Sequence, residues 1–329
     1  MSRLLARSLV LAALAAAVLP AHAYASLTTF QSYTGTVGYS TDGFGSLSNT
    51  GTISASVPAG STVLAAYLYT ATFRNPTNAG IGSTLNGNPV AYGPAVANPS
   101  SGACCLLASA RADVTALVSS VINGGPGGIY NFTVTEASAT QDGEALVVVY
   151  SNPALPVATV GILDGFSNVA GDNTAINFLN PLDPTAPGFF AEMIIGDSFS
   201  CCGQQSTIAV NGTTITNTAG NNDDGAEIAD GSLITVGGFN DPFSPMRPSY
   251  ENDHERYNLV PFVTLGNTSI NVFTRNPDAT DNIFLAAFYV SGIAGINQPP
   301  PTGVPDQGDT LLLMGLGLAV LGVASFRRV

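Results

Sequence analysis

The segment Ala145-Leu146-Val147-Val148-Val149-Tyr150 decides the fold class, because all six of its side chains are apolar or aromatic. A β-strand directs successive side chains to opposite faces of its sheet, so a strand with one solvated face alternates between apolar and polar residues. This segment shows no such alternation. It therefore predicts a central strand that is buried on both faces of its sheet.

Further strand-like runs, separated by Gly, Asn, Asp and Pro, recur over residues 26–296. The strongest short hairpin signal is Asn211-Gly212, between Thr207–Val210 and Thr213–Thr216. Many short strands with such turns predict an all-β protein, an antiparallel β-sandwich that is either one large unit or two fused subdomains near 26–166 and 167–296. The other expected strands are Thr34–Tyr39, Gly51–Val57, Thr62–Phe73, Ile129–Thr135, Ala158–Leu163, Ser206–Val210, Leu233–Val236, Ser269–Thr274 and Ile283–Val290.

One short helix is expected after Asp113, which is a good N-cap residue. Asn123-Gly124-Gly125 is expected to end it, with a glycine for the left-handed position after the helix. About nine residues are too few for an isolated helix, so this one should pack against a sheet. Its expected apolar face, at the i, i+3, i+4 and i+7 spacing, consists of Val114, Leu117, Val118 and Val121.

The charge of the chain argues against nucleic-acid binding. The formal net charge is −13 at pH 7, and the sequence contains neither Lys nor Trp. Affinity for phosphate backbones comes largely from Lys and Arg, and between the terminal segments the chain has only five arginines. Low charge density with abundant Thr, Asn and Gly fits a surface that acts by shape and hydrogen bonding. The sequence thus predicts a structural or interaction protein and not an enzyme.

Residues 1–25 have the three parts of a secretory signal peptide. Arg3 and Arg7 precede the apolar run Leu9–Leu19, and both Ala21-His22-Ala23 and Ala23-Tyr24-Ala25 offer the small-x-small pattern that signal peptidase needs. About eleven apolar residues are too few to span a membrane. Cleavage and export are therefore expected, in preference to an uncleaved anchor.

The other end of the sequence predicts a short membrane helix. A Pro-rich spacer over 297–303 precedes it, and the helix is expected over 310–326. Its apolar run, Leu311–Phe326, covers roughly 24 Å against a hydrocarbon core of ~30 Å, so it spans only with bilayer thinning or help from flanking residues. Arg327 and Arg328 place the C-terminus in the cytoplasm by the positive-inside rule. An ordinary tail anchor is the alternative interpretation.

The motif before this helix gives it a more specific interpretation. Val304-Pro305-Asp306-Gln307-Gly308-Asp309-Thr310, the apolar helix and the terminal Arg pair resemble the PEP-CTERM class of sorting signals, in the variant that carries VPDSG. Gln307 stands where that variant has Ser. The resemblance covers 304–329 and implies recognition by an exosortase, a membrane transpeptidase-like cysteine enzyme. Its residues are Val304, Pro305, Asp306, Gly308, Thr310, Arg327 and Arg328. It implies an inner-membrane intermediate that then reaches the cell surface, outer envelope or extracellular matrix.

A second resemblance concerns the body of the chain. Ala65-Ala66-Tyr67-Leu68-Tyr69, Ala112-Asp113-Val114-Thr115, Asp142–Tyr150 and Leu163-Asp164-Gly165-Phe166 form an ordered set. They resemble a secreted β-domain of bacterial and archaeal surface proteins, the DUF3344 group. The resemblance covers about residues 45–295 and implies an extracellular β-sandwich without known catalytic residues. Thr70 and Ala145 depart from this pattern, which often has Trp there.

Four cysteines form two adjacent pairs, Cys104-Cys105 and Cys201-Cys202. An even number of cysteines in an exported chain favours structural disulfides, although the sequence leaves three connectivities open. A four-cysteine metal site is the alternative. It is less favoured, because metal-binding pairs usually have two to four residues between the ligands.

Two further patterns suggest binding or catalysis. Asp223, Asp224, Glu227 and Asp230 form an acidic stretch that offers a weak calcium site, although it does not match an EF-hand. His254, beside Asp253 and Glu255, offers a base for a hydrolase. Adjacent residues of an extended segment cannot all face one pocket, so a solvated loop is the preferred interpretation. An extracellular polysaccharide is the other expected ligand, although the usual stacking platform lacks Trp. No cofactor is expected apart from calcium.

Overall fold

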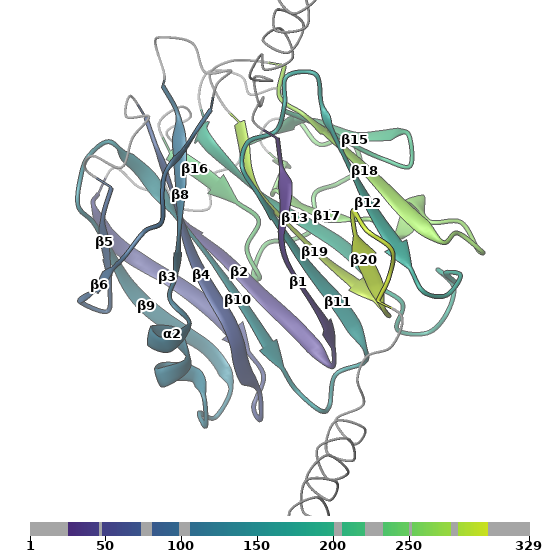
Figure 1. Ribbon diagram of the computed structural model, residues 1–329, viewed down its shortest axis with the longest axis horizontal. Helices are drawn as coiled ribbons and strands as arrows, with labels where there is room; N and C mark the ends of the chain where they lie inside the picture. The colour runs from purple at the N-terminus through teal and green to yellow at the C-terminus, as the bar shows by residue number, and fades with distance from the viewer. Residues whose placement is uncertain are drawn as a thin grey trace, which may run out of the picture.

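The structure, a computed structural model, describes residues 26–45, 48–73, 81–98, 106–200, 206–220, 233–249, 252–277 and 282–301. These residues form antiparallel β-sheets with one short α-helix. The predicted fold class, an all-β and sandwich-like protein with one helix, is confirmed. Four sheets are stacked, and we number them I to IV from left to right in Figure 1. The expected signal peptide and membrane helix lie outside the described ranges. Within those ranges, no helix is long and apolar enough to cross a membrane.

The strands of each sheet are given in their hydrogen-bonded order. Sheet I contains β3 (Thr50–Val57), β9 (Gly128–Glu136), β5 (Ser83–Leu85) and β6 (Asn88–Val90). Sheet II contains β2 (Val37–Phe44), β10 (Gln141–Ser151), β4 (Thr62–Thr72), β8 (Ala108–Asp113) and β7 (Val96–Ala97). Sheet III contains β1 (Thr28–Gly35), β11 (Ala158–Asp164), β19 (Asn282–Ser291), β13 (Ala191–Ser200) and β16 (Leu233–Val236), with β17 (Arg256–Asn258) also paired to β13. Sheet IV contains β15 (Thr213–Ala219), β14 (Ser206–Val210), β18 (Ser269–Arg275), β12 (Asp172–Phe178) and β20 (Ala294–Ile296).

Strand β10 contains the apolar segment that predicts a doubly buried strand, and it lies inside sheet II between β2 and β4. Every residue of β10 except Ser151 is buried. Leu146, Val148 and Tyr150 pack in the apolar layer between sheets I and II. Val147 and Val149 pack on the opposite face, in the layer between sheets II and III. The unbroken apolar run thus corresponds to two different cores.

Sheet III is also buried on both faces. In β19, Leu285 and Ala287 belong to the layer between sheets II and III, whereas Phe288 and Val290 belong to the layer between sheets III and IV. The fold therefore contains three apolar layers, which separate the four sheets in Figure 1. Sheets I and IV each have one face on the outside of the stack.

Both halves of the chain contribute strands to sheet III, where they meet at the β11–β19 pair. Strands β1 and β11 precede residue 166, and β11 pairs along its whole length with β19 from the second half. The chain passes from sheet III to sheet II between β1 and β2, where Gly35 has a φ of 144°. The segment Thr34–Tyr39, expected as one strand, covers this crossing and therefore belongs to two sheets.

The expected helix is α2 (Thr115–Ile122), which packs against β4. Oδ1 of Asp113 accepts a hydrogen bond from the amide of Thr115 at 2.9 Å, although the N-cap position itself is Val114. The expected apolar face is only partly correct. Val114, Val118 and Ile122 are buried, whereas Val121 is 42% exposed. The i, i+4, i+8 row faces the sheet because it packs with the apolar residues of β4 that point toward sheet I.

The hairpin expected at Asn211-Gly212 joins β14 to β15. Asn211 has a φ of 48° and Gly212 a φ of 83°, as a type I′ turn requires at both central positions. A short 3-10 helix, η2 (Val260–Phe262), follows β17.

Candidate functional site

The predicted sorting, disulfide and calcium residues all lie outside the described ranges, so their arrangement stays a prediction. These residues are the sorting motif Val304, Pro305, Asp306, Gly308, Thr310, Arg327 and Arg328, the cysteines Cys104, Cys105, Cys201 and Cys202, and the acids Asp223, Asp224, Glu227 and Asp230.

The described residues that flank the cysteine pairs and the acidic stretch lie at one end of the stacked sheets, the upper end in Figure 1. Thr72 in β4 is paired with both Ala108 and Gln141 at this end of sheet II. In sheet III, Ser200 is paired with Leu233 at the same end. We call this end the polar end, because buried carboxyl groups gather there.

The first group of buried carboxyls surrounds Glu144, which is completely buried in β10. Tyr92 donates a hydrogen bond to Oε2 of Glu144 at 2.5 Å, and Gln141 donates one to Oε1 at 3.3 Å. The hydroxyl of Ser83 also donates to Oε1. Burial raises the pKa of Glu144 to about 8, although the hydrogen bonds from Ser83 and Tyr92 oppose the shift. Glu144 therefore holds its proton near neutral pH.

Glu136 and Asp142 complete this group, and both are buried with no cation beside them among the described residues. Burial raises the pKa of Glu136 to about 9, and the carboxylates of Glu144 and Asp142 add to the shift. Burial also raises the pKa of Asp142 well above its usual range. Among the described residues, neither Oε1 of Glu136 nor Oδ2 of Asp142 has a hydrogen-bond partner.

The second group of carboxyls lies between sheets III and IV around Asp253, which is fully buried. Tyr257 donates to Oδ1 of Asp253 at 2.7 Å and Ser244 donates to the same oxygen at 3.0 Å. Thr216 donates to Oδ2 at 2.5 Å. Nearby Asp197 accepts a hydrogen bond from Ser206 at 3.2 Å, and burial raises its pKa well above the usual range. These hydroxyl groups take the place of water around Asp253.

The structure explains what the acids beside His254 do. Asp253 and Glu255 are both buried, whereas His254 is only partly buried. Glu255 has a φ of 53°, so the backbone turns at this residue and is not extended as the sequence predicts. Both carboxylate oxygens of Asp253 accept hydrogen bonds from hydroxyl groups of sheet IV and of the segment before β17. The amide of His254 donates to Oγ of Ser244 at 2.8 Å. Asp253 and Glu255 are thus packed inside the fold, so the expected solvated loop is wrong for these two residues.

The described residues do not form a metal-binding site. No group of three or more His, Cys, Asp or Glu side chains among them is arranged so that it can hold a metal ion. The two described arginines that form ion pairs, Arg111 with Asp164 and Arg256 with Glu192, do not neutralise the buried carboxyls of the polar end.

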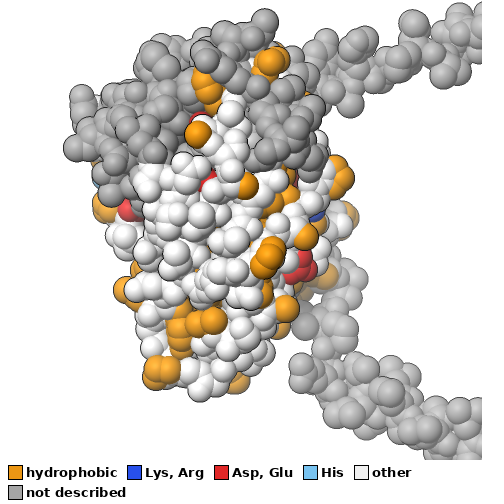
Figure 2. All heavy atoms as spheres, turned by 90° about the vertical axis from the view of Figure 1, so that its left-hand side faces the viewer, with side chains coloured by type: hydrophobic (Ala, Val, Ile, Leu, Met, Phe, Trp, Pro, Cys, Tyr) orange, Lys and Arg blue, Asp and Glu red, His pale blue; other side chains and the backbone are white. Residues whose placement is uncertain are grey.

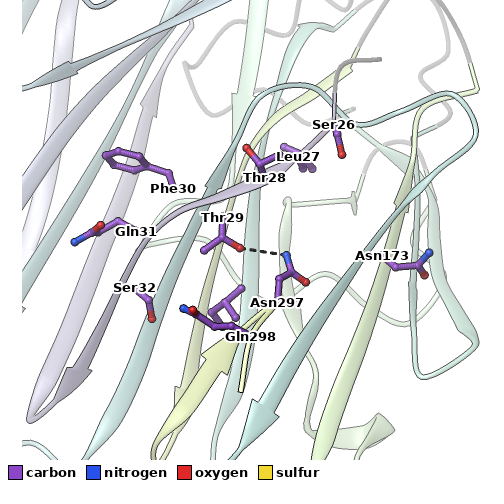
Figure 3. A pocket seen from close by; sticks show the side chains of 11 residues that line it. Ser26, Leu27, Thr28, Thr29, Phe30, Gln31, Ser32, Asn173, Asn297 and Gln298 are labelled. Atoms are coloured by element: carbon purple, nitrogen blue, oxygen red, sulfur yellow. Dashed lines mark hydrogen bonds between the residues drawn. The ribbon is translucent and has the colours of Figure 1, made fainter. Parts of the chain in front are cut away.

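A groove of about 700 Å³ lies between the edges of sheets III and IV. It is lined by residues 26–32 of the β1 segment, by Asn173 in β12 and by residues 296–298 at the end of β20 and just after it. Figure 3 shows Thr29 pointing toward Asn297, whose Nδ2 donates to Oγ1 of Thr29 at 3.1 Å. The same Asn297 accepts a hydrogen bond from the amide of Ala175 at 2.9 Å, and so connects the two sheets. The side chains that line the groove carry no charge.

The outer face of sheet I offers rows of hydroxyl and amide groups. Thr50 donates to Thr135 at 3.0 Å, and Ser54 donates to Asn131 at 3.0 Å, across the pair of strands β3 and β9. Thr52 lies opposite Thr133 in the same register and both are exposed. Figure 2 shows that charged side chains are sparse among the described residues on this side. This face is suited to neutral, hydrogen-bonding ligands.

No protein-family model, curated protein or solved structure matches this chain.

The cysteine hypothesis makes a direct prediction for the exported protein. We expect the four cysteines to form two disulfides, so that alkylation without reduction adds no label. The intact mass should then be lower by four hydrogens than that of the fully reduced protein. Reduction before alkylation should add four labels. Four labels without reduction would contradict the hypothesis and reopen the metal alternative.

Proposed function

We propose that this chain is an exported structural or interaction protein of the cell surface or exopolymer matrix. The observation that supports this best is the distribution of polar groups. The described carboxyls of Glu136, Asp142, Glu144, Asp197 and Asp253 at the polar end are inside the fold, whereas the outer face of sheet I carries neutral hydroxyl and amide groups. Three apolar layers support these surfaces. A rigid scaffold with neutral outer faces is suited to contact with other surface molecules.

The proposed route to the surface depends on the two ends of the sequence. Signal peptidase removes residues 1–25, and the helix at 310–326 holds the chain in the inner membrane. An exosortase then recognises Val304–Thr310 and releases the body to the surface. The resemblance to PEP-CTERM signals supports this step, and so does the shortness of the apolar run, which fits temporary membrane residence.

Truncation tests the role of the tail. A chain that ends at Thr302 keeps every described strand and loses the sorting segment. We expect it to be exported and folded but lost from the membrane and surface fractions, whereas the full chain is retained. A matched variant with Arg327→Ala and Arg328→Ala should accumulate in the membrane. Retention of the truncated chain at the surface would contradict the proposal.

A polysaccharide-binding module is the second candidate function. The rows of Thr, Ser and Asn on sheet I support it, because hydroxyl and amide groups recognise neutral sugars by hydrogen bonds. Soluble matrix polysaccharide should then bind the wild-type protein, and Asn131→Ala with Thr133→Ala should weaken the binding. Calcium binding by the acids at 223–230 is the remaining alternative. Titration with calcium in the absence of polysaccharide distinguishes it from polysaccharide binding, since only a site that includes these acids would bind the ion.

A further inference from the structure

Strand β1 has one open edge. It pairs with β11 on one side, and no described strand pairs with its other side. Its register with β11 is regular from Gln31 to Gly35, after a bulge between Thr29 and Gln31. Within the described ranges, no backbone hydrogen bond outside this ladder involves residues 28–35. The backbone groups that point away from β11 therefore have no protein partner there.

Edge groups of two other outer strands, β3 and β15, are covered. At the edge of β3, the amide of Ser54 donates to Asp42 at 2.5 Å and the amide of Ser56 donates to Ser40 at 2.9 Å. At the edge of β15, the carbonyl of Ile215 accepts a hydrogen bond from the amide of Arg247 at 2.9 Å. Side chains or neighbouring segments thus satisfy edge groups at both places, in contrast to β1.

The sequence of β1 also lacks the usual protection of an edge strand. Natural proteins prevent open edge strands of different chains from pairing by placing Lys, Pro or inward-pointing charges in those strands. The eight residues Thr28–Gly35 contain no charged residue and no Pro, and the bulge disturbs only the first part of the strand. The part from Gln31 to Gly35 is a regular, neutral pairing edge.

A second copy of this chain is the partner that fits the edge best. Two copies of one strand that pair antiparallel about a two-fold axis offer each other the same groups, so such an edge is complementary to itself. Like charges opposite each other would weaken the pairing, and β1 has none. The groove beside β1 leaves room on the sheet IV side for side chains of an added strand (Figure 3).

We propose that β1 is a homotypic docking edge, at which β1 of a second copy adds antiparallel and joins two copies of sheet III into one continuous sheet. Backbone hydrogen bonds give this contact its affinity, as in other cases of strand addition. The inference goes beyond the proposed function and does not depend on how the chain is sorted. It provides a way for surface copies to associate.

Sedimentation of the exported, processed protein tests the proposal. We expect a concentration-dependent dimer that becomes stronger as salt rises, because the net charge of the chain is strongly negative and salt screens the repulsion between copies. Gln31→Lys places a positive charge at the pairing edge and should weaken the dimer by about tenfold or more. Thr52→Lys, an equal change of charge on the exposed face of sheet I, should leave dimerisation unchanged.

Hydrogen exchange gives a second measurement that does not depend on the variants. The amides of residues 31–35 that point away from β11 should become protected as protein concentration rises, while those of β3 stay unchanged. Three results would overturn the proposal: a monomer at all concentrations, a dimer that Gln31→Lys does not affect, or protection of β1 that appears only with added polysaccharide. The last result would assign the edge to a glycan.

Discussion

The free energy of unfolding should fall as the pH rises from about 5 to 9, and Glu136 and Glu144 should account for much of the loss. Each has an ordinary pKa near 4.5, and burial raises it to about 9 for Glu136 and about 8 for Glu144. Above pH 4.5 the unfolded chain releases these protons while the folded chain keeps them. Stability is thus fully present below the unfolded pKa and is lost as the pH rises through the folded pKa.

The size of this effect follows from the shift of each group. Between pH 4.5 and pH 7 the loss is about 3 kcal/mol per group, since one pKa unit corresponds to about 1.4 kcal/mol. Denaturant unfolding at pH 5, 7 and 9 measures it. Glu144→Gln keeps the shape of the protonated acid, so it should match the wild type at pH 5 and exceed its stability by about 3 kcal/mol at pH 7.

The control is Asp183→Asn, because Asp183 is exposed and its hydrogen bonds with Thr185 lower its pKa. Relative to the wild type, this variant should not become more stable as the pH rises from 5 to 9. If the wild type becomes more stable between pH 5 and pH 9, or if Glu144→Gln changes stability equally at both pH values, the buried carboxyls are not protonated in the folded protein.

Two adjacent truncations in β10 should both destabilise the protein strongly. Leu146→Ala opens a cavity between sheets I and II, and Val147→Ala opens one between sheets II and III. Loss of a buried Leu side chain costs about 2–5 kcal/mol, and loss of a buried Val side chain lies toward the lower end of that range. In a sheet with one solvated face, one of two neighbouring residues would tolerate the change.

Leu64→Ala is the matched control for these truncations. Leu64 lies in the neighbouring strand β4 but is 42% exposed, so its truncation should change the free energy of unfolding by no more than about 0.5 kcal/mol. Denaturant unfolding of all three variants at one pH makes the comparison. A neutral Leu146→Ala or Val147→Ala would contradict the stacking of sheet II between two apolar layers.

The apolar run of β10 predicts the fold because burial on both faces removes the alternation that a solvated strand shows. The Asn211-Gly212 turn predicts its hairpin for an equally local reason, the positive φ of both residues. The pairing of β1 with β11 and of β11 with β19 depends on residues more than a hundred positions apart, and no local pattern specifies it. Strand β13 was missed because Glu192 and Asp197 interrupt its apolar pattern, and tertiary packing buries Asp197 nevertheless.

The buried carboxyls of the polar end could not be predicted from their sequence neighbours. Asp142 and Glu144 stand before the apolar run of β10, where an exposed turn is the ordinary expectation for acids. Around Glu144, the partners are Ser83 and Tyr92, which the chain brings over it from a distance. For the same reason Asp253 has structural hydroxyl partners that the sequence around His254 does not indicate.

The intact mass of the protein from cells with and without their exosortase tests the central claim most directly, namely that this body is handed from the membrane to the cell surface. With the enzyme, we expect a surface or matrix species that has lost residues 1–25 and the apolar tail after the Val304–Thr310 motif. Without the enzyme, the chain should stay in the membrane fraction and retain all residues through Val329. The same mass and the same location in both cells would contradict the account and leave an ordinary tail anchor.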